Sequence, residues 1–398
     1  MTRHSKALPS GWQKVRFGDV VRLSSDRCIN PAAANVERYV GLEHLTPGDL
    51  RIRSWGLVSD GVTFTNCFKP GQVLFGKRRA YQRKVAIADF EGVCSGDIYV
   101  FDVADSRLLP DLLPFICQTE GFFQHALRTS AGSLSPRTNW TSLADYEFDL
   151  PPHPVQLRVA KLLAARESLV ASYQSQAQAA ECLERSFLVH QVSSLLDEPS
   201  VSRVTIGESG EVIMGRQRSP SYTTGRCSHK YLRVANVFDD CIDTSDVLEM
   251  DFDTADRERY RLRNGDLLLN EGQSLELLGR CAMYRGELDG AACFQNTLIR
   301  YRPVATSADF ALTWMRHLYY KGTFAQLGSK TTSIAHLGLR RFIELPFAVP
   351  DRKREAEIVS QSELLRKARR DAAHRYAQAI SSLATAVSLE SLLSEVPA

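Results

Sequence analysis

The sequence predicts an α+β chain in which a mixed α/β globule occurs twice and each copy is followed by one long helix. Two observations support this prediction. Similar motifs recur at an interval close to half of the 398-residue length. Residues 155–198 and 351–396 contain neither glycine nor proline, the residues that most disfavour helix interiors. We expect the two helices to pair as an antiparallel coiled coil; the alternative is that each covers only its own globule.

Three pairs of motifs define the repeat. They align Tyr39 in RYVGLEHL with Tyr231 in KYLRVANV, Gly71 in KPGQVLFGK with Gly265 in RNGDLLLNEG, and Leu150 in FDLPPHP with Leu345 in IELPFAVP. The offsets are 192, 194 and 195 residues. Solenoid repeats span only about 20–50 residues. The interval therefore indicates a duplicated domain.

Each globule is expected to contain short strands separated by turns rich in Gly and Asp. The strand candidates are GQVLFGK, KVAIADF and GDIYVFDV in the first globule, and GDLLLNEG, GRCAMYRG and QNTLIRYRP in the second. Helical segments are expected near the end of each globule, over residues 108–127 and 308–327. The predicted boundaries are 1–152 and 199–350 for the globules, and 153–198 and 351–398 for the helices.

An apolar stripe follows each long helix at the spacing of three, four or seven residues that is typical of coiled coils. In the first helix we assign it to Val159, Leu163, Val170, Tyr173, Leu183 and Phe187. In the second helix we assign it to Ile358, Leu365, Tyr376, Ile380, Leu383 and Val387. A helix of about forty residues spans about 60 Å, so such a pair could hold two globules apart.

Composition restricts the class of protein. The formal net charge is only +3, with 44% hydrophobic and 24% charged residues, which suits a soluble globular protein and excludes a uniformly basic surface. No apolar run reaches the ~20 residues that cross a bilayer, and the N-terminal residues lack the apolar core of a signal peptide. The nine cysteines form no CxxC pair. We therefore expect a cytoplasmic protein with reduced thiols.

A basic cluster in the first globule predicts contact with DNA. The stretch VLFGKRRAYQRKVA, at residues 73–86, lies in an acid-free interval between Asp60 and Asp89. Arginine forks suit phosphates and guanine edges, a glutamine can pair with adenine, and a tyrosine can stack. The candidate residues are Lys77, Arg78, Arg79, Tyr81, Gln82, Arg83 and Lys84. The alternative is an ordinary solvated loop.

Three further segments are candidate DNA-reading loops. The equivalent position of the second globule reads NEGQSLELLGR, and the loops 130–140 and 328–336 precede the last strand of each globule. Their polar side chains suit phosphates or base edges, with ordinary polar loops as the alternative. The candidates are Asn270, Glu271 and Gln273, then Arg137 and Asn139, and finally Lys330, Thr331, Thr332, Ser333 and His336. Because the motifs around these loops repeat while the polar residues within them differ, we expect the two globules to bind two different DNA half-sites.

These motifs resemble the specificity subunits of type I restriction–modification systems. The resemblance is carried by KPGQVLFGKRRAYQRKVAIADFEGVCSGDIYVFD and continues in GDLLLNEG, FQNTLIRYRP and the opening LPSGWQKVRFGDV. Two departures occur: Ala80 stands where the family often has proline, and only Gln156 remains of the Pro-x-x-Glu-Gln pattern that often starts the first helix.

The resemblance implies two target recognition domains, each reading one half of a split asymmetric DNA site, joined by helices that set the spacing. It also implies two methyltransferase subunits docked on the helices, and restriction subunits reached through them. Adenine N6-methylation and ATP-driven cleavage would belong to those partners. S-adenosylmethionine, ATP and Mg are expected only there, with no cofactor and no metal in this chain.

Two other classes of function fit the sequence less well. An amino-methyltransferase needs an Asn/Asp-Pro-Pro-aromatic tetrapeptide, which DLPPHP does not provide, and no Gly-rich cofactor loop is present. A scaffold without DNA contact would not require the basic cluster. The same motifs suit a standard restriction system and a related methylation-based phage-defence complex.

Overall fold

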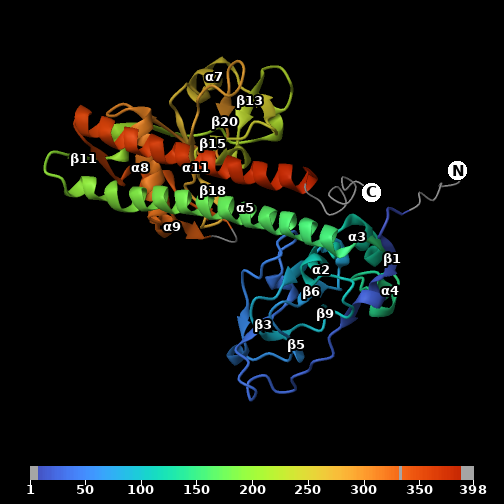
Figure 1. The fold of residues 1–398 in the computed structure, drawn as a ribbon. Helices are drawn as coiled ribbons and strands as arrows, with labels where there is room; N and C mark the ends of the chain where they lie inside the picture. Colours follow the sequence, from blue (N-terminus) through green and yellow to red (C-terminus); the bar gives the residue numbers. More distant parts are fainter. Residues whose placement is uncertain (1–7, 331–333, 387–398) are drawn as a thin grey trace. The chain divides into compact units, whose positions relative to one another are not determined.

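The computed structural model describes residues 8–330 and 334–386 (Figure 1). The chain forms two compact units. The first unit holds residues up to Tyr173 and those from Tyr376 on, and the second unit holds Gln174–Arg375. Each unit therefore contains one globule with a piece of both long helices. Among the described residues, no helix is long and apolar enough to cross a membrane.

The first unit is built on two small four-stranded sheets. The main sheet is antiparallel, in the order β2 (Val21–Leu23), β9 (Ile98–Val103), β6 (Val73–Gly76) and β7 (Val85–Ile87). The second has the order β4 (Gly56–Leu57), β3 (Arg38–Val40), β8 (Gly92–Cys94) and β5 (Asn66–Phe68), with β3 and β8 parallel. A ribbon of β1 (Gln13–Arg16) and β10 (Glu147–Leu150) joins the two ends of the globule. The three strands expected from the sequence are thus confirmed.

Short helices cover the main sheet of the first unit. They are α1 (Phe17–Val20), α2 (Leu113–Ile116), α3 (Glu120–Arg128) and α4 (Trp140–Ala144). Helix α3 begins where the hydroxyl of Thr119 accepts a hydrogen bond from the backbone of Phe122. Phe17, Phe75 and Phe122 are fully buried and pack ring against ring. This aromatic core holds the helices on the sheet and confirms the helical segment expected before residue 128.

The second unit repeats this architecture. Its main sheet has the order β12 (Gly210–Met214), β21 (Leu298–Pro303), β17 (Leu267–Asn270) and β19 (Cys281–Met283). A second sheet contains β16 (Leu248–Asp251), β13 (Ser228–Leu232) and β20 (Cys293–Phe294), and β11 (Ser202–Thr205) pairs with β24 (Pro346–Val349). Its helices are α6 (Ile206–Ser209), α7 (Thr254–Tyr260), α8 (Ala308–Tyr320), α9 (Thr323–Leu327) and α10 (Leu339–Ile343). The strands and helices expected in this half are confirmed.

Two of the three aligned motif pairs are structurally equivalent. Tyr39 pairs in parallel with Val93, as Tyr231 does with Cys293. The backbone of Gly71 donates to Ala88 O at 2.8 Å, and that of Gly265 donates to Tyr284 O at 2.9 Å. Both glycines have a positive φ, 87° and 92°, a conformation that favours glycine. The duplication is therefore real at the level of individual hydrogen bonds.

The third pair was aligned wrongly. Leu150 pairs with Gln13 at the end of its ribbon, and the residue in that place in the second unit is Val349, which pairs with Ser202. Leu345 instead lies where Tyr146 lies, since each carbonyl accepts from the first residue of α6 or α1. The offset thus grows from 189 residues at the first strand to 199 at the last. The two Leu-Pro dipeptides are not structurally equivalent, because the second globule has more residues between these strands.

The long helices are α5 (His153–Ser186) and α11 (Arg352–Ala386). They contact each other inside the second unit, where Arg369 Nε lies 2.6 Å from Glu184 Oε2. Each unit combines the beginning of one helix with the end of the other, as the expected antiparallel pairing requires. After α5 the chain continues through a π-helical turn, Phe187–Gln191, and a 3₁₀ turn, Ser193–Asp197. Gln156, in the first turn of α5, connects the helix to the globule by accepting from Leu109 N at 2.8 Å.

The apolar stripe is correct in part. Val159 and Leu163 are buried in the core of the first unit and Ile358 in that of the second, so the first turns of each helix cover their own globule. The half-buried members are Val170, Tyr173, Phe187, Leu365 and Tyr376. The side chain of Leu383 and all of Val387 lie outside the described part of the chain.

Two stripe assignments are wrong. Leu183 is 59% exposed and Ile380 45% exposed. The neighbouring Glu184 and Ala379 are buried instead, at 1% and 7% exposure. The apolar pattern failed here because a buried carboxylate paired with arginines occupies the inward position of α5. Packed charges follow the helical period as well as apolar side chains do, and a hydrophobic pattern does not reveal them.

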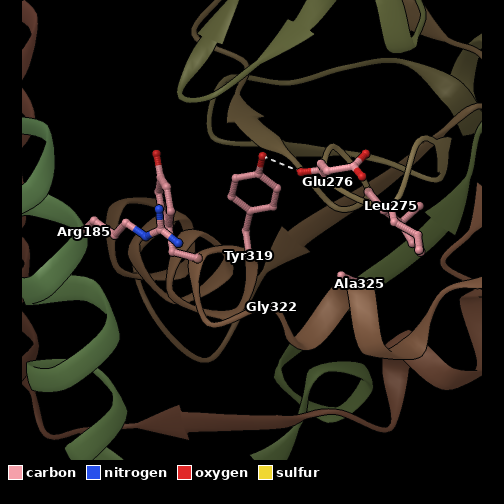
Figure 2. A pocket seen from close by; sticks show the side chains of 8 residues that line it. Arg185, Leu275, Glu276, Tyr319, Gly322 and Ala325 are labelled. Atoms are coloured by element: carbon pink, nitrogen blue, oxygen red, sulfur yellow. Dashed lines mark hydrogen bonds between the residues drawn. The ribbon is translucent and has the colours of Figure 1, made fainter. Parts of the chain in front are cut away.

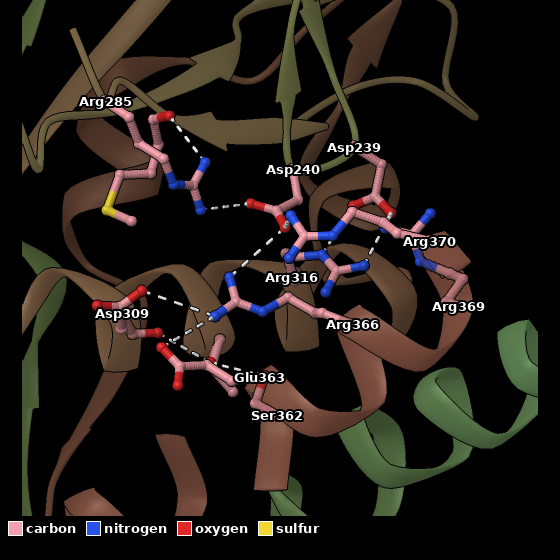
Figure 3. Close-up of polar contacts among 12 residues, drawn as sticks. Asp239, Asp240, Arg285, Asp309, Arg316, Ser362, Glu363, Arg366, Arg369 and Arg370 are labelled. Carbon is pink, nitrogen blue, oxygen red and sulfur yellow. Dashed lines mark hydrogen bonds and ion pairs between the residues drawn. The ribbon is translucent and has the colours of Figure 1, made fainter. Parts of the chain in front are cut away.

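A buried ionic cluster fastens both long helices to the second globule. Figure 3 shows the part of this cluster that involves α11. Arg316, on α8, is fully buried and forms ion pairs with Glu184 on α5 and with Asp239 at 2.8 Å. Burial opposes ionisation of Asp239, but the hydrogen bonds and charge of Arg316 outweigh it and lower the pKa of this carboxyl. The adjacent Asp240 is buried and faces the guanidinium of Arg366 on α11 at 3.5 Å. Four segments of the second unit thus meet at one cluster.

Candidate nucleic-acid interface

The structure brings the two candidate segments of the first unit together. Arg78 and Arg137 form an antiparallel β-bridge. On either side, Arg79 N donates to Pro136 O at 2.7 Å, and Thr138 N donates to Lys77 O at 3.0 Å. The loop after β6 and the loop before α4 therefore form one continuous edge, although they are about sixty residues apart in the sequence.

One carboxylate orients the arginines of this edge. Asp97 accepts from Arg137 Nε at 2.9 Å and from Arg78 Nη1 at 3.1 Å. Burial works against ionisation of Asp97, yet the two arginines outweigh burial and lower its pKa. The side chain of Arg137 remains 54% exposed, so part of its guanidinium faces solvent. Asp97 was missed because it follows the acid-free interval in the sequence and joins the cluster only through the sheet.

Two lysines of the cluster have structural roles. Lys84 Nζ donates to Leu42 O at 2.6 Å. Lys77 lies over the ring of Tyr99 at 4.5 Å, and burial lowers the pKa of its ammonium. Each of these two lysines would have to break its contact in the globule to reach a phosphate, and their assignment to DNA binding stays a prediction.

The other residues of the cluster differ in exposure. Arg79 has a left-handed backbone, with φ of 54°, and is exposed, and Tyr81 is 53% exposed. Arg83 pairs with Glu120 at 2.5 Å, and Gln82 is half-buried. Asn139 is exposed, but its side-chain oxygen accepts from Ser142 N at 2.8 Å and caps α4. The exposed guanidinium groups and Tyr81 are therefore the groups best placed to meet a ligand.

The second unit forms the same edge from different residues. β18 (Gly272–Gln273) pairs with β23 (Ala335–His336), which also pairs with β22 (Ser329–Lys330). Gly272 opposes His336 as Arg78 opposes Arg137. Moreover, Glu271 N donates to Thr297 O at 2.9 Å, as Lys77 N donates to Asp97 O. The expected equivalence of the candidate loops is thus confirmed for the backbone.

Individual candidates of the second unit differ in accessibility. Asn270 is fully buried, with its amide 3.4 Å from Val237 O, which corrects its assignment as a base reader. Glu271 is also buried and contacts His336, whose side chain is 47% exposed. Gln273 is half-buried. Thr331, Thr332 and Ser333, and the side chain of Lys330, lie outside the described residues.

A second basic segment was missed by the sequence reasoning. Residues 212–238 contain no acid but include Arg216, Arg218 and Arg226, which is the same signal that identified the first cluster. Arg216 forms a parallel bridge with Gln295, and its guanidinium stacks on Tyr222 at 3.8 Å. Arg218 and Arg226 are exposed. The backbone bridge connects this segment to the loop that holds Thr297, beside the edge of the second unit.

Two pockets lie next to other parts of the units. One, of about 280 Å³, is lined by Arg185, Leu275, Tyr319 and Tyr320 among others, and Tyr319 closes one side by donating to Glu276 O at 2.9 Å (Figure 2). The other, of about 520 Å³, lies between α5 and the globule of the first unit. None of the candidate DNA-binding residues lines either pocket. Within the described residues, no group of three or more His, Cys, Asp or Glu is placed to hold a metal ion.

Comparisons with known proteins agree with this architecture. No protein-family profile matches the chain. Over 176 residues it is 28% identical to the type I restriction enzyme EcoDI specificity subunit of Escherichia coli, a match that covers 41% of this chain and 37% of the relative. The match thus spans less than two fifths of that relative's length.

Solved structures extend the likeness to the whole fold. A chain from a type I restriction–modification system, studied for its complex assembly and conformational transition, superposes with a TM-score of 0.60 at 18% identity. The superposition covers 97% of this chain and 99% of the other. The S subunit of a type I system from M. genitalium gives a TM-score of 0.54 at 12% identity, with 98% and 97% covered. At these identities the likeness concerns the fold.

Proposed function

We propose that this chain is the DNA sequence-recognition subunit of a type I restriction–modification complex or of a related methylation-based phage-defence complex. Each unit reads one half of a bipartite asymmetric site, and the paired helices set the distance between the halves. The chain carries no catalytic centre of its own. Its action belongs in the cytoplasm, where it meets cellular and invading DNA.

The observation that carries this proposal is the repeated edge with unlike side chains. Both units join the same two loops by the same backbone pairing, Arg78 with Arg137 and Gly272 with His336. The first edge presents guanidinium groups, whereas the second presents an imidazole and no arginine at the paired positions. Side chains that reach base edges carry sequence information, while the backbone frame only positions them. The two edges share a backbone arrangement but carry different side chains, and this combination suits a DNA site whose two halves differ in sequence.

The proposal assigns the chemistry to partners. Two methyltransferase subunits dock on the helices and bring S-adenosylmethionine to adenine, and restriction subunits that use ATP and Mg join through them. Double-stranded DNA is the shared ligand. The fastening of α5 and α11 to the second globule by the ionic cluster supports this division, because a rigid helical platform would transmit the position of the bound half-site to docked subunits.

A reconstitution tests the proposal. The purified chain alone, incubated with S-adenosylmethionine and DNA, should give no methylation. Addition of the methyltransferase subunit encoded with it should give adenine methylation at one bipartite motif, detected by sequencing that reports modified bases. Turnover by the partner-free chain, or methylation without any motif when both are present, would refute the proposal.

A further inference from the structure

The buried Glu271 and the exposed His336 form a pair on the edge of the second unit. His336 Nδ1 lies 2.9 Å from Glu271 Oε2. Because an ionised carboxylate only accepts hydrogen bonds, Nδ1 carries the proton. The side chain of Glu271 is 9% exposed and that of His336 is 47% exposed. Within the described residues Nε2 of His336 has no hydrogen-bond partner, so the pair leaves one ring nitrogen for a ligand.

The backbone around His336 holds the ring in place. Leu337 N donates to Glu271 O at 2.9 Å, and Arg341 Nη2 lies 3.3 Å from His336 O. A Cβ placed on Gly272 would lie 3.4 Å from Cε1 and 3.5 Å from Nδ1 of the imidazole. The ring therefore lies beside Gly272, and the contact of Nδ1 to Glu271 orients it.

The first unit uses the same plan. There a partly buried carboxylate, Asp97, holds Arg137 at the position that corresponds to His336. In each unit a carboxylate of the globule thus orients one exposed nitrogen-bearing side chain on the edge. In the sequence an exposed aliphatic residue precedes each of them by two or three positions, since Leu134 is 92% exposed and Ile334 is 49% exposed. Such side chains suit the methyl group of thymine.

We infer that His336 is a specificity-determining residue of the second unit, which contacts a base through Nε2, and that Glu271 is a positioning residue without contact to DNA. This inference rests on the proposed function and deepens it. The ligand chemistry is the major-groove edge of an A·T pair, which presents the polar atoms of adenine beside the methyl group of thymine. His336 Nε2 meets adenine, and Ile334 meets the methyl group.

Two substitutions of His336 separate base reading from a structural role. In His336→Gln the amide reaches the place of Nε2, whereas in His336→Asn it reaches only the place of Nδ1 and keeps the contact to Glu271. Reconstituted complexes with the methyltransferase subunit would be assayed on all single-base variants of the site. His190→Gln, a change at an exposed histidine distant in sequence from the edge, is the matched control.

His336→Asn should lose roughly tenfold or more of the discrimination at one position of the second half-site. His336→Gln should retain more of it, the control all of it, and every variant should leave the first half-site unchanged. Glu271→Gln should relax the same single position as His336→Asn.

The outcomes are distinct. If His336→Asn keeps the wild-type motif, or if it preserves discrimination better than His336→Gln does, the inference is wrong while the proposed function stands. If the wild-type complex itself has no motif, the proposed function fails and the inference fails with it. A general loss of methylation at every site in both variants would assign His336 to structure and would also overturn the inference.

Discussion

Replacement of Arg316 by methionine should strongly destabilise the second unit. This arginine is fully buried and lies among Glu184 and Asp239, with Glu184 2% and Asp239 19% exposed at their side chains. Methionine fills a similar volume without a charge. Removal of one partner of a buried ion pair leaves the other charge uncompensated and costs about 3–5 kcal/mol.

Two remaining contacts reduce the expected cost. Arg369 still lies 2.6 Å from Glu184, and the hydroxyl of Tyr320 still donates to Asp239 at 2.8 Å. We therefore expect the low end of the range, about 3 kcal/mol for Arg316→Met. Since 1.4 kcal/mol corresponds to a factor of ten, the protection of α8 amides against hydrogen exchange should fall roughly 100-fold. Mass spectrometry of α8 peptides measures this change.

An exposed ion pair in the same unit is the control. Lys367 and Asp371 lie 2.9 Å apart on α11, with side chains 72% and 47% exposed. Lys367→Met should cost no more than about 0.5 kcal/mol. The double variant Arg316→Met, Glu184→Met should cost less than the sum of its single changes, because it also removes one uncompensated carboxylate. If Arg316→Met lowered the protection of α8 amides no more than Lys367→Met does, the ionic cluster would not fasten the helices.

The remaining predictions concern DNA affinity, site spacing and pH. If the guanidinium of Arg137 contacts a phosphate, Arg137→Ala should weaken DNA binding and reduce the slope of log K against log salt concentration by about one. An unchanged slope together with a changed motif would show that Arg137 contacts a base instead. Four residues inserted into α5 add about 6 Å of helix, so the gap between half-sites should grow by one or two base pairs. An active variant that keeps the original gap would show that the helices do not set the distance between half-sites. Burial lowers the pKa of His317 to about 4, while its hydrogen bond to Leu188 O opposes the shift. As the pH falls, the unfolded chain therefore binds a proton at this histidine before the folded chain does. The free energy of unfolding should consequently fall by up to about 3 kcal/mol between pH 6.5 and pH 4. Urea unfolding across this range should show a smaller loss in His317→Gln, and equal losses in both proteins would contradict the assignment.

Much of the fold was predictable because local patterns carry it. The strands around Gly71 and Gly265 were found from alternating apolar runs and turn residues, and both glycines adopt the positive φ that such turns require. Glycine- and proline-free segments revealed both long helices. The misaligned third motif shows the limit: Leu345 shares a Leu-Pro dipeptide with Leu150, but only the strand pairing shows that Val349 is its equivalent.

The candidate interface was predictable as segments but not as side-chain roles. Charge patterning found the loop after β6, whereas the partner that orients it, Asp97, lies immediately before β9, the neighbouring strand. Asn270 looked like a reader by residue type, yet the strand that contains it turns its side chain into the core. Leu183 failed for the related reason that a buried salt bridge claims the inward helix position at Glu184. These side-chain roles depend on contacts between segments that are far apart in the sequence, so the residue pattern of one segment does not reveal them.

A domain exchange tests the central claim most directly. Residues 12–150 would be replaced by the first globule of a type I specificity subunit whose motif is known, and the methylated adenines of cells carrying the chimera would be mapped. If each unit reads one half-site with its own edge, as we propose, only one half of the motif should change, while the other half and the gap stay constant. A chimera in which both halves change, or neither, would contradict the account of two independent readers on one paired-helix frame.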